Sequence, residues 1–102
     1  MNNNNVWGPP AWTFLHTVTY NYPENPTNED KRNYLNFFDS LKHVLPCNKC
    51  KGHYKENLKK YDLNNSLNSR QDLVKWLIDK MVNQYCLIQI YIINIIIYIM
   101  LI

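Results

Sequence analysis

Pro46-Cys47-Asn48-Lys49-Cys50 is the stretch of this 102-residue chain that separates two helical patterns and begins the second. A proline ends the preceding helix, because its ring clashes with the turn before it and it has no N–H to donate. The helix start that follows stabilises a thiolate through unpaired N–H groups and the helix dipole. Five lysines between residues 49 and 60 add positive charge. The stretch therefore predicts a redox-active pair, Cys47 and Cys50, at the start of a helix.

Two helices are predicted ahead of this stretch. Pro9 and Pro10 suit the first turn of the first helix. Residues that recur at helical spacing form one face of this helix: Trp12, Leu15, His16, Thr19 and Tyr20. After Pro23 and Pro26, Thr27 with Asp30 has the pattern of a capping box. The apolar stripe of the second helix is Tyr34, Phe37, Phe38, Leu41, Val44 and Leu45.

Two further helices follow. One face of the third carries both thiols and includes Cys47, Cys50, Tyr54, Leu58 and Tyr61. A polar loop from Asp62 to Asn68 comes next, and Ser69 with Asp72 gives a second capping signal. The stripe of the fourth helix is Leu73, Val74, Trp76, Leu77, Met81 and Val82. Four helices without alternating strand patterns predict an all-α four-helix bundle.

Composition narrows the function classes. The net charge is +3 and basic residues are mixed with acids, which argues against nucleic acid as a partner. Three cysteines do not build a disulfide scaffold, and the start lacks the layout of a signal peptide. We expect residues 1–5 to be a disordered asparagine-rich leader and residues 6–85 to form the domain. A dithiol in a reducing compartment is more often catalytic or metal-binding than structural.

The segment 86–102 differs from the rest, because it is rich in isoleucine and carries no charged residue. Its length is at the short limit of a membrane span, roughly 17–25 residues. Three interpretations stay open: a C-terminal membrane anchor, a buried or interface-forming fifth helix, and the product of a disturbed reading frame. Cys86, the remaining cysteine, is interpreted as a subunit cross-link, a single-thiol relay or an inert buried thiol.

The motifs in combination resemble one family. Trp7-Gly8-Pro9-Pro10-Ala11-Trp12 runs on to His16, Cys47-x-x-Cys50-x-x-His53 follows, and Trp76-Leu77 comes last. In this order the chain closely resembles the Erv/ALR family of FAD-linked sulfhydryl oxidases, especially the short single-domain members of large DNA viruses. The resemblance covers roughly Val6 to Asp79. It implies a helical bundle with FAD at its mouth, usually as a homodimer.

The resemblance also implies roles for individual residues. Electrons pass from a substrate dithiol to oxygen, giving a disulfide and hydrogen peroxide. Cys47 would be the sulfur attacked by substrate, and Cys50 the sulfur against the flavin. The FAD contacts would come from Gly8, Trp12, His16, Tyr20, His53, Trp76 and Asn83. The expected substrate is a thiol protein, thioredoxin-like or another virus-encoded thiol carrier, in host cytoplasm or in a virion, with membrane association possible through residues 86–102.

The fourth helix departs from the family pattern, approximately WLxxxHNxVN. Without a gap, Met81 and Val82 replace the His-Asn pair that grips FAD; with a two-residue gap, Val82-Asn83 keep the Val-Asn. A second interpretation therefore stays open: a degenerate, non-enzymatic helical binding module or membrane-tethered module with an inert or metal-binding dithiol. A structural zinc site would use Cys47, Cys50 and His53, with a fourth ligand from His16, His43 or Cys86. Trp12, His16, Tyr20 and Trp76 are also compatible with ordinary core packing.

Overall fold

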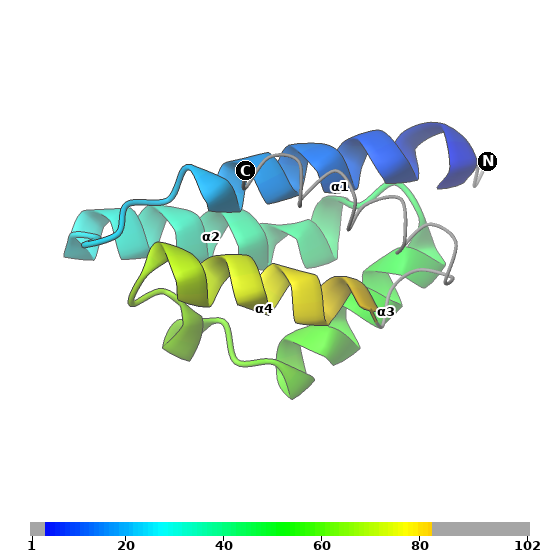
Figure 1. The fold of residues 1–102 in the computed structure, drawn as a ribbon. Helices are drawn as coiled ribbons and strands as arrows, with labels where there is room; N and C mark the ends of the chain where they lie inside the picture. The colour runs from blue at the N-terminus through cyan, green and yellow to red at the C-terminus, as the bar shows by residue number, and fades with distance from the viewer. Residues whose placement is uncertain (1–3, 83–102) are drawn as a thin grey trace.

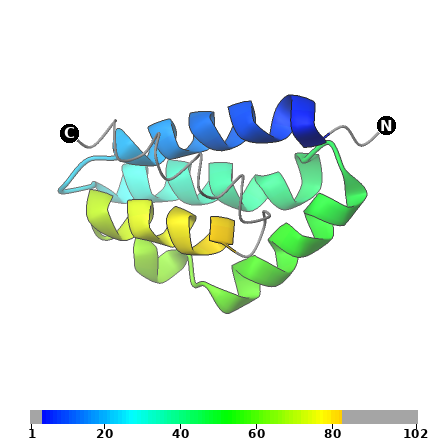
Figure 2. The same ribbon diagram turned by 45° about the vertical axis from the view of Figure 1, so that its right-hand side comes forward.

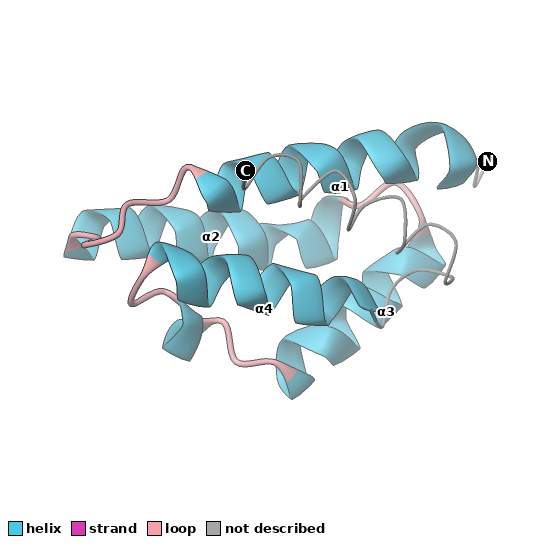
Figure 3. Ribbon diagram, viewed as in Figure 1, coloured by secondary structure: helices cyan, strands magenta, loops and turns pink. Residues whose placement is uncertain are grey.

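The computed structural model describes residues 4–82, and within that range it contains helices and no strand (Figures 1 and 3). The elements are α1 (Asn4–Tyr20), α2 (Asn28–Val44), α3 (Asn48–Lys60), the short 3-10 helix η1 (Asn64–Ser66) and α4 (Arg70–Val82). The predicted all-α bundle of four helices is confirmed for this part of the chain. Asn83, Cys86 and the rest of the segment 86–102 lie outside the described residues.

The helices pack in two pairs. α1 packs along α4, and α2 packs against α3, which runs obliquely to the other helices (Figure 2). Both ribbon views place the connection between α2 and α3 beside the N-terminal end of α1 (Figures 1 and 2). The most deeply buried large side chains are Tyr22, Phe38, Tyr54, Leu73 and Leu77. No helix within residues 4–82 combines the length and the apolar character needed to cross a membrane.

Local hydrogen bonds confirm both predicted capping signals. Asp30 N–H donates to Thr27 Oγ1 at 3.0 Å, and Thr27 N–H donates to Asp30 Oδ2 at 2.9 Å, which completes a capping box for α2. At the start of α4, Asp72 N–H donates to Ser69 Oγ at 3.1 Å. Each bond satisfies backbone or side-chain groups that a helix start otherwise leaves open.

The start of α1 differs from the prediction. The helix begins at Asn4, within the expected leader and ahead of Pro9, where we expected the first turn. Pro9 and Pro10 therefore lie inside the helix, where their missing N–H groups leave earlier carbonyls without the usual donor. The prolines keep a helical φ, so the helix continues through them.

The apolar stripe of α2 is only partly buried. Phe38, Leu41 and Leu45 lie in the core, whereas Phe37 is 37% and Val44 64% exposed. Phe38 packs edge-on against Trp76 with ring centroids 5.4 Å apart, and its carbonyl accepts a hydrogen bond from Tyr54 Oη. The bundle therefore covers a narrower arc of α2 than the sequence pattern suggests.

Two hydrogen bonds join the loop that follows α1 to the segment between η1 and the start of α4. Tyr22 Oη donates to the Leu67 carbonyl at 2.7 Å, and Arg70 Nε donates to the Tyr22 carbonyl at 2.7 Å. Leu63 and Leu67 are buried on either side of η1.

The short helix η1 was not predicted, because the polar segment around Asp62 has the composition of a loop. Asp62 holds it locally by accepting from Asn64 N–H at 3.0 Å.

Candidate active site

The two predicted redox cysteines lie where the chain leaves α2 and enters α3. Pro46 is exposed in this connection, and Cys47 is the N-cap of α3 with an extended backbone (φ −159°, ψ 122°). The Cys47 sulfur accepts a hydrogen bond from the backbone N–H of Cys50 at 3.2 Å. A sulfur atom therefore takes the position that a serine or aspartate oxygen usually holds at a helix start.

The surroundings of Cys47 favour its thiolate. The thiol and the backbone N–H of Cys50, with smaller contributions from the backbone N–H and the ammonium of Lys49, hold the pKa of Cys47 below its ordinary value, although burial acts against them. Among the described residues, Cys47 and Cys50 are both in the thiol form and do not belong to a disulfide. Because thiolate is the nucleophile in thiol–disulfide exchange, this arrangement suits a redox cysteine.

The exposure of the two cysteines is the reverse of the order we expected. Cys47, expected to be the accessible sulfur, is 5% exposed, whereas Cys50 is half-buried. The N-cap bond holds the Cys47 sulfur over the first turn of α3. Exposure does not single out Cys47 as the point of attack, so the assignment of roles stays a prediction.

The predicted cofactor face of α1 is largely buried. Gly8, Trp12 and His16 are buried and Tyr20 is half-buried. The rings of Trp12 and His16 lie 6.3 Å apart between centroids, at an angle of 42°. Burial lowers the pKa of His16 from 6.5 to about 4, so the imidazole is neutral at pH 7. The face offers a flat aromatic ring and a neutral histidine close together.

Trp7 is a candidate residue that the sequence argument did not select. Its Nε1 is buried and has no hydrogen-bond acceptor among the described residues. A buried donor left unsatisfied costs about 1–3 kcal/mol, and a bound acceptor would remove that cost. Its position beside Gly8, in the motif that ends at His16, was the available signal.

The dithiol and this face of α1 approach the same core. Cys50 packs against the hydrophobic core cluster, which includes Trp12 and Trp76. The connection that carries Cys47 lies beside the N-terminal end of α1 in both views (Figures 1 and 2). The fold thus brings the third helix start and the first half of α1 to one end of the bundle.

Other predicted site residues are placed less favourably. Trp76 is buried in the core, and its indole Nε1 donates to the Tyr61 carbonyl at 3.0 Å, so its polar edge is engaged by the protein. His53 is exposed on α3. Asn83 lies outside the described residues. These three positions stay predictions.

The zinc alternative gains no support from the geometry. Within the part of the chain that the structure describes, no group of three His, Cys, Asp or Glu side chains is arranged to hold a metal ion. Cys86, one of the possible fourth ligands, is not among the described residues.

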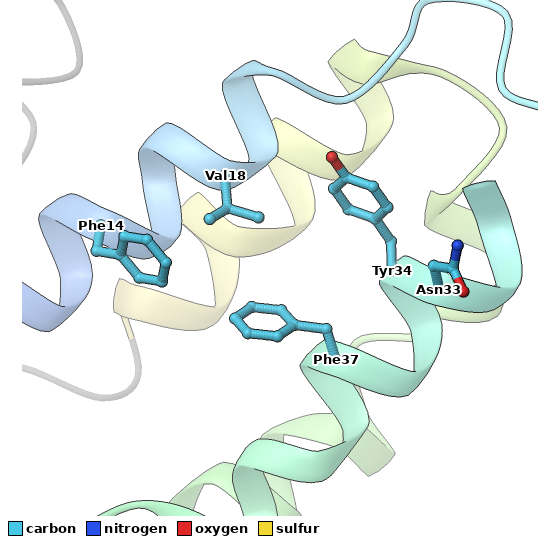
Figure 4. A pocket seen from close by; sticks show the side chains of 5 residues that line it. All are labelled: Phe14, Val18, Asn33, Tyr34 and Phe37. Atoms are coloured by element: carbon cyan, nitrogen blue, oxygen red, sulfur yellow. The ribbon is translucent and has the colours of Figure 1, made fainter.

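A separate apolar hollow of about 190 Å³ lies between α1 and α2 (Figure 4). It is lined by Phe14, Val18, Asn33, Tyr34 and Phe37. Phe14 is 59% exposed, and helical geometry puts it on roughly the opposite side of α1 from His16. The hollow is therefore distinct from the dithiol and from the Trp12–His16 face.

The buried His16 makes the stability of the bundle dependent on pH. Because the pKa of His16 is about 4 in the folded protein and 6.5 unfolded, the unfolded chain binds the proton more readily between these values. The free energy of unfolding should therefore fall as pH drops from about 6.5 to 4, by about 2–3 kcal/mol from this group. Urea unfolding followed by circular dichroism across this range measures the fall.

Two variants complete that test. His16→Gln removes the titration and should show a smaller fall between pH 6.5 and 4 than the parent chain. His43→Gln changes an exposed histidine on α2 and should follow the parent curve. Equal slopes for the parent and His16→Gln would contradict the assignment.

Comparisons with known proteins agree with the motifs. A model of the Erv1 / Alr family matches residues 9–85. The chain is 51% identical over 82 residues to "Probable FAD-linked sulfhydryl oxidase" of Acanthamoeba polyphaga mimivirus, covering 78% of this chain and 57% of that protein. It is 34% identical to a FAD-linked sulfhydryl oxidase of Arabidopsis thaliana, over 69% of this chain and 36% of the relative. A mitochondrial FAD-linked sulfhydryl oxidase of Saccharomyces cerevisiae is 33% identical, with coverages of 69% and 36%. The chain thus spans between about a third and three fifths of these relatives' lengths.

Proposed function

The chain belongs to the Erv1 / Alr family, and on this premise we propose that it is an FAD-linked thiol oxidase. The names of its relatives supply the cofactor and the class of reaction. The observation that carries the proposal is the 3.2 Å hydrogen bond from Cys50 N–H to the Cys47 sulfur at the start of α3. It marks a thiol prepared to react as thiolate, next to a second thiol that can close a disulfide with it.

The exchange step follows from the two sulfurs. In the oxidised enzyme a substrate thiolate attacks the Cys47 sulfur, forms a mixed disulfide and displaces Cys50 as thiolate. The second substrate thiolate then attacks the substrate sulfur, closes the substrate disulfide and releases Cys47 as thiolate. The substrate loses two electrons and two protons, and Cys47–Cys50 gains the electrons. The N–H of Cys50 and the Lys49 charge stabilise Cys47 as the leaving thiolate.

The residues present fit FAD at the α1 face. The buried Trp7 Nε1 lacks an acceptor among residues 4–82, and a cofactor oxygen or nitrogen would supply one. Trp12 offers a ring to stack on, buried Gly8 allows close approach of the backbone, and neutral His16 and half-buried Tyr20 offer polar atoms. FAD, when bound, accepts the two electrons from the dithiol and passes them on.

The finer parts of the proposal rest on the resemblance. Oxygen is the proposed acceptor, with hydrogen peroxide as product, and a thioredoxin-like thiol protein is the proposed substrate, in host cytoplasm or in a virion. The homodimer is proposed as well, and the apolar hollow with exposed Phe14 and Phe37 offers it a surface (Figure 4). Membrane association through residues 86–102 stays a prediction.

A non-enzymatic module with an inert dithiol is the less favoured alternative. It was motivated by Met81 and Val82 at positions where the family pattern has His-Asn. The family match runs through that region to residue 85, beyond the Asp79 limit of the motifs. The surroundings of Cys47 also favour a reactive thiolate over an inert thiol.

The test of the proposal is flavin content. We expect the purified full chain to carry, or to regain on incubation with FAD, a flavin absorption band near one equivalent per chain, and to consume oxygen when dithiothreitol is added. Trp12→Ala should lower the flavin content, because the stacking ring is lost. Protein that stays colourless after incubation with excess FAD, while folded by circular dichroism, would contradict the proposal.

A further inference from the structure

The charge of the described bundle is concentrated on one helix. α3 carries five lysines and a single acid, Glu56, for a net charge of +4. The whole chain has a net charge of +3, which leaves −1 for all other residues. The helix that begins with the dithiol therefore carries more net positive charge than the chain as a whole.

Three of these lysines form a row. Lys51, Lys55 and Lys59 follow each other at i, i+4 spacing, so they lie along one side of α3, starting one residue after Cys50. Lys55 and Lys59 are exposed and Lys51 is half-buried. The opposite arc of the helix, which includes Tyr54 and Asn57, is buried in the bundle.

The row is poorly neutralised. Lys59 meets Glu56 at 3.8 Å, but both side chains are more than 70% exposed, and such a pair contributes little. Among the described residues, Lys51 and Lys55 form no ion pair. Like charges at i, i+4 spacing destabilise a helix. Apart from Glu56, no acid among the described residues forms an ion pair with the row, which therefore presents its positive charge to solvent.

We propose, resting on the proposed function, that the lysine row of α3 docks an acidic segment of the thiol-bearing polypeptide that this protein oxidises. The row starts at the same end of α3 as the dithiol and runs along the exposed side of the helix, away from the buried arc that holds Cys50. Carboxylates bound on it therefore belong to a chain whose cysteines reach the dithiol around the start of the helix. Complementary charge at the rim of such a site raises the association rate and selects partners, and it weakens as salt rises.

A polypeptide fits this surface better than a nucleic acid. The reacting groups at the start of α3 are thiols, whose exchange partners are thiols or disulfides. Single-stranded bases are held by a series of exposed aromatic side chains, whereas on α3 Tyr54 is buried and His53 is the one exposed ring between these lysines. The substrate class is therefore an acidic dithiol protein or the acidic flank of one.

The test uses three dithiols and two matched variants. Two synthetic peptides share one Cys-Gly-Pro-Cys sequence, followed by four glutamates in one and four glutamines in the other; dithiothreitol is the uncharged reference. Lys55→Gln/Lys59→Gln removes two charges of the row more than a turn from the cysteines. Arg32→Gln/Lys75→Gln removes two exposed charges from α2 and α4. Oxygen consumption gives kcat/KM for each combination.

At low salt, the parent chain should prefer the glutamate peptide over the glutamine peptide by about 3- to 10-fold, in line with one to two exposed charge pairs. The preference should shrink at about 0.5 M salt and in the row variant, but persist in the control variant. Turnover of dithiothreitol should be the same in all three proteins. Equal kcat/KM for the two peptides in the parent chain would overturn the proposal, as would a row variant that also loses flavin, because the row would then serve the cofactor.

A binding measurement keeps this inference separate from the proposed function. Fluorescein-labelled versions of both peptides, with serine replacing both cysteines, are titrated with each protein and followed by anisotropy. Tighter binding of the glutamate peptide, lost in the row variant, supports the docking surface even if no oxidase activity is found. Equal binding of both peptides, or stronger binding of an RNA oligonucleotide of the same charge, would overturn it.

Discussion

Cys50→Ser should reduce oxygen consumption on dithiothreitol to background, a loss of at least about a thousand-fold, because a disulfide cannot form with one sulfur. Serine keeps the backbone N–H of residue 50, which bonds the Cys47 sulfur. The variant should therefore fold as the parent does and retain bound flavin. An oxygen electrode and an absorption spectrum of the same sample measure both quantities.

Two controls separate the chemistry from the roles of the two sulfurs. Cys86→Ser removes the third cysteine and should leave turnover unchanged. Cys47→Ser should also stop turnover, so the single variants are compared in their reaction with an aromatic disulfide reagent near pH 7. The thiol of Cys47, with its lowered pKa, should react faster in Cys50→Ser than the thiol of Cys50 does in Cys47→Ser.

Either of two results would contradict these assignments. Turnover that survives Cys50→Ser would show that the electrons take another route. Faster reaction of Cys50 than of Cys47 would reverse the proposed order, in agreement with the greater exposure of Cys50.

Phe38→Ala should lower the free energy of unfolding by about 3–5 kcal/mol. The side chain is completely buried and packs edge-on against Trp76, so its removal leaves a cavity between α2 and α4. A domain of this size typically has only about 5–15 kcal/mol of stability. Urea unfolding should therefore show a much lower midpoint with an unchanged slope.

Val44→Ala is the matched control on the same helix. Val44 is 64% exposed although it belongs to the same predicted stripe, and its truncation should cost less than about 0.5 kcal/mol. Similar losses for both variants would mean that the stripe, and not the observed core, decides stability. Each measurement is made at pH 7, where His16 is neutral.

The features that the sequence predicted correctly depend on interactions between residues close together in the chain. The Thr27–Asp30 box, the stop at Pro46 and the helix start at Cys47 involve neighbouring residues, and all three are present. Helical periodicity also placed Trp12 and His16 on one face of α1, and both are buried in the structure.

The errors arise where the outcome depends on distant partners. The neighbouring residues do not indicate that Phe37 stays exposed while Phe38 is buried. The difference depends on which side of α2 packs against α3. The bond from Tyr22 Oη to the Leu67 carbonyl joins residues far apart in the chain, so no window of sequence contains it. The burial of Cys47 depends on the fold in the same way.

The N-cap role of Cys47 has a consequence for which substitutions the position tolerates. In the proposed exchange, one sulfur atom both begins α3 and forms the bond with substrate, so selection for folding and selection for reactivity would act on the same side chain. Serine separates the two functions, because its oxygen caps a helix N-terminus but does not take part in disulfide exchange. Alanine does neither, and the loss of the cap lowers the free energy of unfolding by about 1 kcal/mol. A relative that has abandoned oxidation should therefore drift to serine, threonine, aspartate or asparagine here before it drifts to alanine.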